Sequence, residues 1–157
     1  MSNMPDDRLF QEDLRTEPFW MLVACVLVNV TRWAQARPVL DGIRARWPTA
    51  AGLAAADLSE VEQVVRCLGL GQRRAAKLVG LAAAWSRAEP RSRDDVLSLP
   101  GCGAYAADSW EMFVLGRRDV APTDRALLSY LSGAPEGRSH ARWRRQGRSA
   151  LYRGPSI

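Results

Sequence analysis

The sequence predicts an all-α fold, and three observations support that prediction. Almost no stretch of the 157 residues alternates apolar and polar positions with the period of two that is typical of strands. The apolar residues instead recur with helical spacing, and proline, glycine and serine stand where such segments begin and end. The composition, with 47% hydrophobic and 25% charged residues, is that of an ordinary globular domain with a real core.

The first part of the chain is expected to form three long helices. Residues 17–33 are apolar nearly all round, and Pro18 suits a first turn, so they predict a buried central helix. A second helix is expected over 34–47, directly before a proline. Residues 57–69 follow as a third, because Ser59 opens a Ser-x-x-Glu capping box and a glycine closes the segment.

The second part continues the helical pattern. Residues 71–88 are expected to form a long helix, and 92–99 a short helix that runs into a Pro-Gly turn. A helix over 104–116 ends at a glycine, and the last clear helix covers 124–133. The whole gives about eight helices in one domain over residues 1–133.

The remaining segment, residues 134–157, differs from the rest in composition. It carries six arginines against one acidic residue, a charge of +5, which equals the net charge of the whole chain. The charges of residues 1–133 therefore sum to about zero. A basic tail of this kind attracts a polyanion such as DNA, or is simply a solvated and partly disordered end, and the sequence leaves both interpretations open.

Several classes of site and location are excluded by what the sequence lacks. Cys25, Cys67 and Cys102 form no CxxC pair, which argues against a zinc site, an iron–sulfur cluster or a disulfide framework. His140 is the single histidine, so a His-based triad is not expected, and no metal or other cofactor is predicted. The longest apolar run, 19–28, is too short to span a bilayer, and no signal peptide opens the chain. A cytoplasmic, nucleoid-associated protein is expected.

The segment "LPGCG" between two helices is typical of a helix–hairpin–helix. Successive backbone N–H groups in such a turn and at the following helix start suit a DNA phosphate. Gly101 and Gly103 are expected to keep the turn, and the approach of the phosphate, free of a Cβ, with Cys102 between them. Leu99 would anchor the hairpin in the core. A hairpin that binds nothing remains the alternative.

Asp124 lies 21 residues after Gly103, at the start of the last clear helix. An aspartate before an apolar helical run is an ordinary N-cap. The spacing also allows the helix to return toward the hairpin, where its N-terminus would keep the carboxylate ionised. Such a carboxylate could stabilise a cationic transition state or orient a water, and both interpretations can hold for one residue.

An ordered set of motifs resembles the helix–hairpin–helix DNA glycosylases of the endonuclease III superfamily. The set consists of "VNVT", "WPTA", "LGLGQRRAAK", "GCGAY" and "PTD", and the likeness covers about residues 8–133. Within that superfamily it is closest to the glycosylase domain of the methyl-CpG-binding-domain thymine glycosylases. The resemblance implies a two-lobed helical fold without an iron–sulfur cluster. It also implies double-stranded DNA with a mismatched or modified base as the partner, bound by a monomer.

The resemblance further implies hydrolysis of the N-glycosidic bond of a flipped pyrimidine, thymine or uracil opposite guanine, in base excision repair. Asp124 would stabilise the oxocarbenium-like sugar or activate the attacking water. Tyr105 stands where bifunctional members carry the lysine that forms a Schiff base. Because tyrosine cannot form that imine, the enzyme is expected to lack lyase activity.

The remaining site residues expected from the resemblance contact DNA or the flipped base. Leu70 matches the intercalating wedge, with Gln72 or Arg73 beside it, although Leu70 could equally be the hydrophobic partner of a helix cap. Asn29 and Thr31, at the end of the central helix, would line the base pocket.

Three departures from the family pattern keep two other functions open. Val30 and Ala126 replace an arginine and a lysine of the thymine glycosylase branch, and residues 134–157 do not look like the closing helices of the family. A non-catalytic helix–hairpin–helix DNA-binding protein would fit these losses. A same-fold enzyme acting on a modified or hypermodified pyrimidine is the other alternative.

Overall fold

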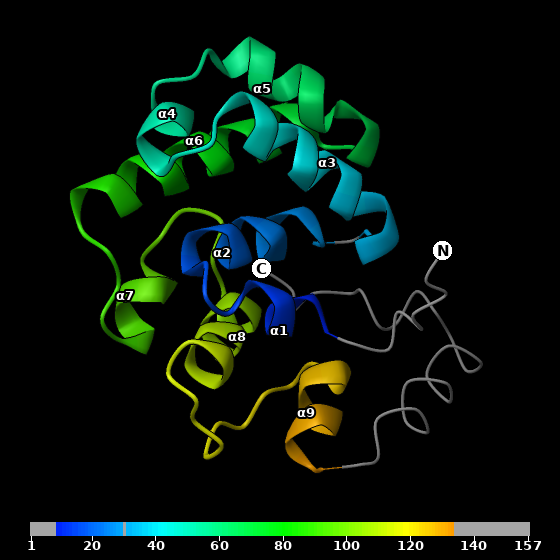
Figure 1. Ribbon diagram of the computed structural model, residues 1–157, viewed down its shortest axis with the longest axis vertical. Coiled ribbons are helices and arrows are strands. Elements are labelled where there is room, and N and C mark those ends of the chain that lie inside the picture. The colour runs from blue at the N-terminus through cyan, green and yellow to red at the C-terminus, as the bar shows by residue number, and fades with distance from the viewer. Residues whose placement is uncertain (1–8, 30, 134–157) are drawn as a thin grey trace.

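The computed structural model describes residues 9–29 and 31–133, and in these ranges every regular element is a helix, as the sequence predicts (Figure 1). The elements in chain order are α1 (Phe10–Leu14), α2 (Pro18–Leu27), α3 (Trp33–Arg46), α4 (Ala50–Ala54), α5 (Leu58–Val65), the 3₁₀ turn η1 (Arg66–Leu68), α6 (Gly71–Arg87), α7 (Arg93–Leu97), α8 (Ala104–Phe113) and α9 (Arg125–Leu131).

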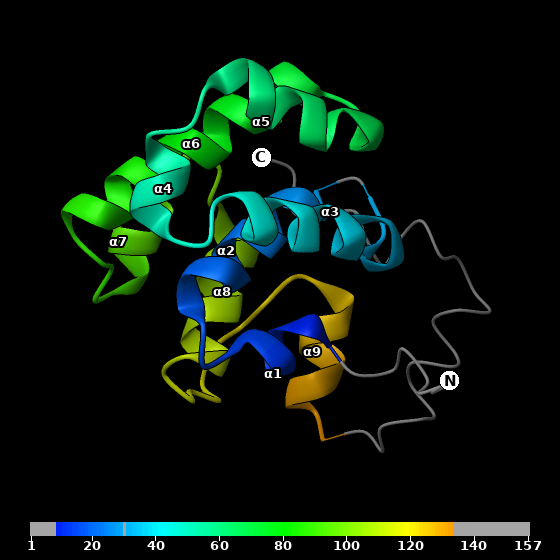
Figure 2. The same cartoon turned by 45° about the horizontal axis from the view of Figure 1, so that its top comes forward.

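The helices form two lobes around α2. In Figure 1 the lobe of α3, α4, α5 and α6 lies above α2, while α1, α8 and α9 lie below it. Helix α2 contacts members of both lobes, α3 and α6 on one side and α1 and α8 on the other. Figure 2 shows the same separation from another direction, with α1 and α9 side by side. The two-lobed fold is therefore confirmed, and α2 is the element that joins the lobes.

The apolar sequence of α2 explains its central place. Every residue from Phe19 to Val28 is buried, and Met21 and Leu27 are fully inaccessible. Pro18 occupies the first turn, where its missing N–H leaves no intrahelical bond unmade. Burial of such residues contributes roughly 1.5–3 kcal/mol for each large side chain. The lobes are thus held together by the most hydrophobic segment of the chain.

The prediction of one helix through Trp33 is wrong, because α2 ends at Leu27. The hydroxyl of Thr31 donates to the carbonyl of Leu27 at 2.5 Å, which gives that carbonyl a side-chain partner just beyond the helix end. Side chains of this type compete with the backbone for helical carbonyls and favour chain breaks. A second helix, α3, then starts at Trp33.

Two short helices and one cap also differ from the sequence prediction. Helices α1 and α4 have five residues each and were not expected, because one turn carries too little periodicity to be recognised. Helix α5 begins one residue after Asp57, whose carboxylate accepts from the N–H and the hydroxyl of Ser59 at 2.9 and 2.8 Å. The cap is therefore this aspartate, and the expected capping box at Ser59 is wrong.

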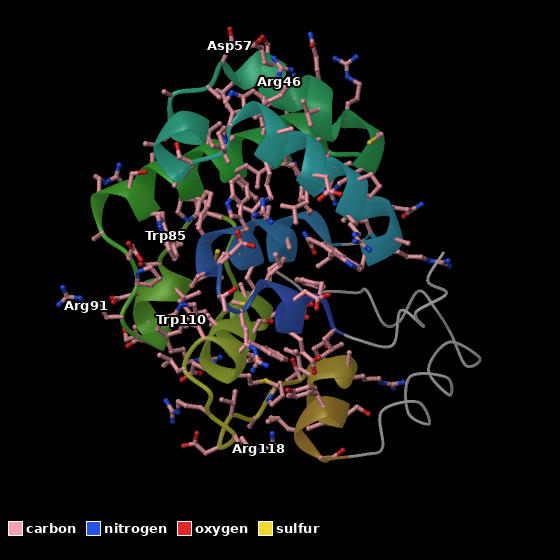
Figure 3. The ribbon with its side chains drawn as sticks, in the orientation of Figure 1. Arg46, Asp57, Trp85, Arg91, Trp110 and Arg118 are labelled. Carbon is pink, nitrogen blue, oxygen red and sulfur yellow. The ribbon has the colours of Figure 1, made fainter. Side chains whose placement is uncertain are left out.

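The core includes several tryptophans. Trp20 and Trp110 are buried, and Trp33, Trp47 and Trp85 pack partly buried against it, Trp85 with its ring centroid 5.5 Å from that of Phe19. Figure 3 shows Trp85 and Trp110 within the body of the protein, whereas Arg91 and Arg118 lie at its periphery. None of the described helices is long and apolar enough to cross a membrane. The basic segment 134–157 lies outside the described residues.

Candidate DNA-binding and catalytic site

Helices α7 and α8 and the turn between them form the hairpin that the sequence predicts. Leu99 and Cys102 are both 7% exposed, so each end of the turn is anchored in the core. The N–H of Cys102 donates to the carbonyl of Leu99 at 3.1 Å and closes the turn. Burial raises the pKa of the Cys102 thiol to about 12, so this side chain is a neutral packing group.

The two glycines of the turn have different reasons to be glycine. Gly101 has a φ of +76°, and a Cβ there would lie 3.1 Å from both Val26 Cγ2 and Lys77 Cβ. Gly103 has a φ of −109°, and no atom lies within 4 Å of the Cβ it lacks. The fold therefore requires glycine at position 101. At position 103 the described residues leave room for a Cβ, so a requirement for glycine there would have to come from outside them.

The start of α8 offers unpaired hydrogen-bond donors. The N–H groups of Gly103 and Ala104 find no acceptor among the described residues, as is usual in the first turn of a helix. Together with the positive end of the helix dipole, such groups form a small anion site. The open space at Gly103 lies directly beside these donors.

Asp124 is the N-cap of α9, as the sequence predicts. Its Oδ2 accepts from the N–H of Leu127 at 3.1 Å, and the side chain is half-buried. Burial raises the pKa of Asp124 above its ordinary value, although the N–H groups of Leu127 and Ala126 oppose the shift. The nearby charge of Asp108 raises it further. A carboxylate with a raised pKa is a stronger base than an ordinary aspartate.

Hydrogen bonds link α1 to the hairpin helix α8. Gln11 Nε2 donates to the hydroxyl of Tyr105 at 2.7 Å and to Ser109 Oγ at 3.1 Å. These hydrogen bonds form a cluster of Gln11, Tyr105 and Ser109 from α1 and α8. Burial raises the pKa of the nearby Cys25 thiol, and the charges of Cys102 and Asp124 add smaller contributions.

Gln11 is the member of this cluster that the sequence analysis missed. It is 1% exposed, and its Oε1 is the one buried side-chain polar atom without a hydrogen-bond partner among the described residues. Buried acceptors are nearly always paired, so an unpaired one beside a hydroxyl pair indicates a place for a ligand or a water. The pattern "LFQEDL" around it gave no sign, since α1 is a single turn.

The loop before α6 places Leu70 in an unusual conformation. Leu70 has a φ of +54° and is 55% exposed, and Gly69 before it has a φ of +80°. The left-handed region costs a residue with a Cβ about 1–2 kcal/mol. Gln72 and Arg73 lie exposed on the first turn of the helix. Leu70 is also the N-cap residue of α6, and its role as a wedge stays a prediction.

Asn29 and Thr31 lie beyond the end of α2 rather than within its last turn. Asn29 is half-buried, and its backbone carbonyl accepts a hydrogen bond from the guanidinium of Arg74. The hydroxyl of Thr31 is already engaged with the carbonyl of Leu27. The segment is thus tied to α6, and the roles of the two side chains in a base pocket stay predictions.

An ionic network connects the two hairpin helices on another face. Arg93 of α7 donates to Asp108 at 2.5 Å and to Glu111 at 2.7 Å, and Arg117 donates to Glu111 at 2.8 Å. Both carboxylates are almost fully buried on α8, and they line an open cleft of about 660 Å³. No group of three or more His, Cys, Asp or Glu side chains in the described ranges could hold a metal ion.

The fold and the hairpin define a helical DNA-repair domain of the helix–hairpin–helix class, and comparison with known proteins agrees. A family model described as "HhH-GPD superfamily base excision DNA repair protein" matches residues 23–135. The chain belongs to this family.

Three curated relatives are similar to the chain. A methyl-CpG-binding domain protein 4-like protein of Arabidopsis thaliana is 32% identical over 123 residues, 78% of this chain and 27% of the relative. A thymine-DNA glycosylase of Aeropyrum pernix is 34% identical over 95 residues, 58% of this chain and 43% of the relative. An adenine DNA glycosylase of Mycolicibacterium smegmatis is 36% identical over 125 residues, 77% of this chain and 42% of the relative. The chain thus matches less than half the length of each relative.

Proposed function

We propose that the chain is a monofunctional DNA glycosylase that removes thymine or uracil opposite guanine. The observation that carries the proposal is the half-buried carboxylate of Asp124 at the start of α9, with its raised pKa, in a fold whose hairpin leaves the N–H groups of Gly103 and Ala104 without an acceptor among the described residues. The structure therefore holds both a candidate base and a candidate phosphate site. The family membership supports a reaction on DNA.

The proposed reaction begins with extrusion of the target nucleotide, since the N-glycosidic bond is inaccessible within the duplex. The N–H groups at the start of α8 bind a backbone phosphate, and Leu70 fills the space that the base leaves. The carboxylate of Asp124 then accepts a proton from a water that attacks C1′, while its charge stabilises the cationic sugar. The bond from C1′ to the base nitrogen breaks, and its electron pair leaves with the base.

The preference for thymine or uracil is supported by the relatives, one of which is named a thymine-DNA glycosylase. The relatives named for thymine and for adenine show that the family accommodates more than one base. Extruding a matched base costs more free energy than extruding a mispaired one, and this difference favours mispaired substrates.

A panel of duplexes tests the substrate directly. Single-turnover reactions are run on duplexes with one T·G, U·G, 5-hydroxymethyluracil·G or A·8-oxoguanine pair, each divided into samples with and without hot alkali. Strand cleavage of the T·G or U·G duplex after alkali alone is expected, because Tyr105 cannot form a Schiff base. Cleavage without alkali would contradict the monofunctional assignment, and release of adenine alone would overturn the pyrimidine preference.

The hairpin glycines give a paired prediction. Gly103→Ala is expected to lower the melting temperature only slightly, because its Cβ meets no atom of the described structure and the remaining cost is that of alanine as an N-cap of α8. The same Cβ would obstruct a phosphate at the start of α8, so duplex affinity is expected to fall about tenfold. Gly101→Ala is the contrast: its positive φ and two 3.1 Å contacts predict a loss of stability of about 1–2 kcal/mol as well. Thermal denaturation and fluorescence-anisotropy titration separate the two effects, and unchanged affinity of Gly103→Ala would count against phosphate binding there.

A further inference from the structure

Arg74 is a buried cation that no described carboxylate neutralises. The residue is 3% exposed and lies in the first turns of α6. Its Nη1 donates to the carbonyls of Leu68 and Gly69 at 2.6 and 3.0 Å, and its Nη2 donates to the carbonyl of Asn29. Burial lowers the pKa of Arg74, yet an arginine stays charged in a protein.

The three carbonyls explain how the charge is tolerated. Leu68 ends the turn η1 that follows α5, and Asn29 lies just beyond the last turn of α2. Carbonyls at helix C-termini lack intrahelical partners and carry the negative end of the helix dipole. A single guanidinium at 74 therefore caps two helical ends that lie far apart in the sequence.

The same hydrogen bonds hold the strained leucine. Arg74 binds the carbonyls of Leu68 and Gly69, which directly precede Leu70, and its own N–H donates to the carbonyl of Leu70 at 2.9 Å. Strained backbone conformations persist only where the surroundings fix them. The Arg74 side chain thus supplies two fixed points directly before the left-handed residue, and the helical bond from its backbone N–H holds the carbonyl of Leu70 itself.

We infer that Arg74 is a positioning residue that sets Leu70 at a fixed place relative to the end of α2. The inference rests on the proposed function, in which Leu70 is the wedge that replaces an extruded base. Because one guanidinium bonds both the wedge loop, residues 68–70, and Asn29, it joins the loop that evicts the base to the segment after α2. Arg74 acts on DNA through Leu70 and contacts neither base nor phosphate.

A double-mutant cycle tests this indirect role. Arg74→Lys keeps the charge but loses the planar fork that bonds three carbonyls, and Leu70→Ala removes the wedge. The wild type, both single variants and the double variant are titrated with a duplex that carries a tetrahydrofuran abasic-site analogue opposite guanine. Single-turnover release of uracil from a U·G duplex is measured for the same four proteins.

Each single variant is expected to weaken analogue binding about tenfold, and the double variant is expected to bind within about twofold of Leu70→Ala alone. Such non-additivity means that the arginine acts through the leucine. If the two losses multiply in the double variant, or if Leu70→Ala has no effect, the inference is overturned.

Controls separate the inference from a folding defect and from the proposed function. Arg87→Lys makes the same exchange at the exposed far end of α6 and is expected to behave as the wild type. Arg74→Gln is measured in parallel with Arg74→Lys. The double-mutant cycle is analysed with the variant that still unfolds in a single cooperative thermal transition. Non-additive analogue binding without uracil release in the wild type would uphold the inference and refute the proposed function. If the losses of analogue binding add and the wild type releases uracil, the inference is overturned and the proposed function is upheld.

Discussion

Asp124→Asn is expected to reduce base release at least about 1000-fold while leaving duplex affinity within a fewfold of the wild type. Asparagine is as good an N-cap as aspartate, so the hydrogen bond to the N–H of Leu127 can be kept. It cannot accept the proton of the attacking water, nor does it carry charge to stabilise the sugar cation. Single-turnover kinetics on a U·G duplex and anisotropy titration measure the two quantities.

The same variant is expected to be at least as stable as the wild type at neutral pH. Burial raises the pKa of Asp124, so the folded protein binds this proton more tightly than the unfolded chain does. The protonated carboxyl of Asp124 contributes fully to the free energy of unfolding below pH 3.8, the ordinary pKa, and this contribution is lost as the pH rises through the raised pKa of the folded state. Above that range the wild type bears the cost of a partly buried charge, and Asp124→Asn removes that cost. A clearly lower melting temperature at neutral pH, or retained base release, would contradict the assignment of Asp124 as a strained catalytic carboxylate.

The second large effect is expected for Arg93→Met, which should lower the free energy of unfolding by about 1–3 kcal/mol, because one partner is buried and the other is partly screened by solvent. Asp108 is 5% exposed and has Arg93 as its ion-pair partner, so the variant leaves a buried carboxylate without a cation. That loss is a large fraction of the stability of an ordinary domain. Urea denaturation at neutral pH provides the measurement.

Arg117→Met is the matched control for this network. Glu111 keeps its 2.7 Å ion pair with Arg93 in that variant, and Asp119 is 70% exposed, so the expected loss is about 1 kcal/mol or less. Adding Asp108→Asn to Arg93→Met should recover part of the stability, because the buried charge is removed. Equal losses in the two arginine variants would show that Asp108 does not depend on Arg93.

The features that the sequence predicts well are those with local signals. The hairpin depends on a Pro-Gly-x-Gly turn between two apolar segments, and Asp124 caps α9 because an aspartate directly precedes an apolar helical run. Helix α2 follows from an unbroken apolar run. In each case the physical cause acts within a few residues of the chain, so the pattern is visible without knowledge of the fold.

The features that the sequence does not predict depend on contacts between distant segments. Gln11 bonds Tyr105 across 94 positions, and Arg74 bonds Asn29 across 45. Nothing in the run "GQRRAAK" distinguishes Arg74, which is buried, from its exposed neighbour Arg73, because the difference is set by which helix ends lie over α6. The early end of α2 has a different, local cause, because the Thr31 hydroxyl bonds the carbonyl of Leu27 four residues before it, while the apolar run continues past Leu27 and predicts a longer helix.

The central claim, that this chain hydrolyses an N-glycosidic bond, is tested most directly by product analysis. A U·G duplex is incubated with excess protein, and the free base and both strands are quantified by mass spectrometry over time. Free uracil is expected to appear in step with an abasic strand that stays intact until alkali is added. Duplex that is bound but chemically unchanged, for U·G and T·G alike, would contradict it and would leave a helix–hairpin–helix protein that binds DNA without cleaving it.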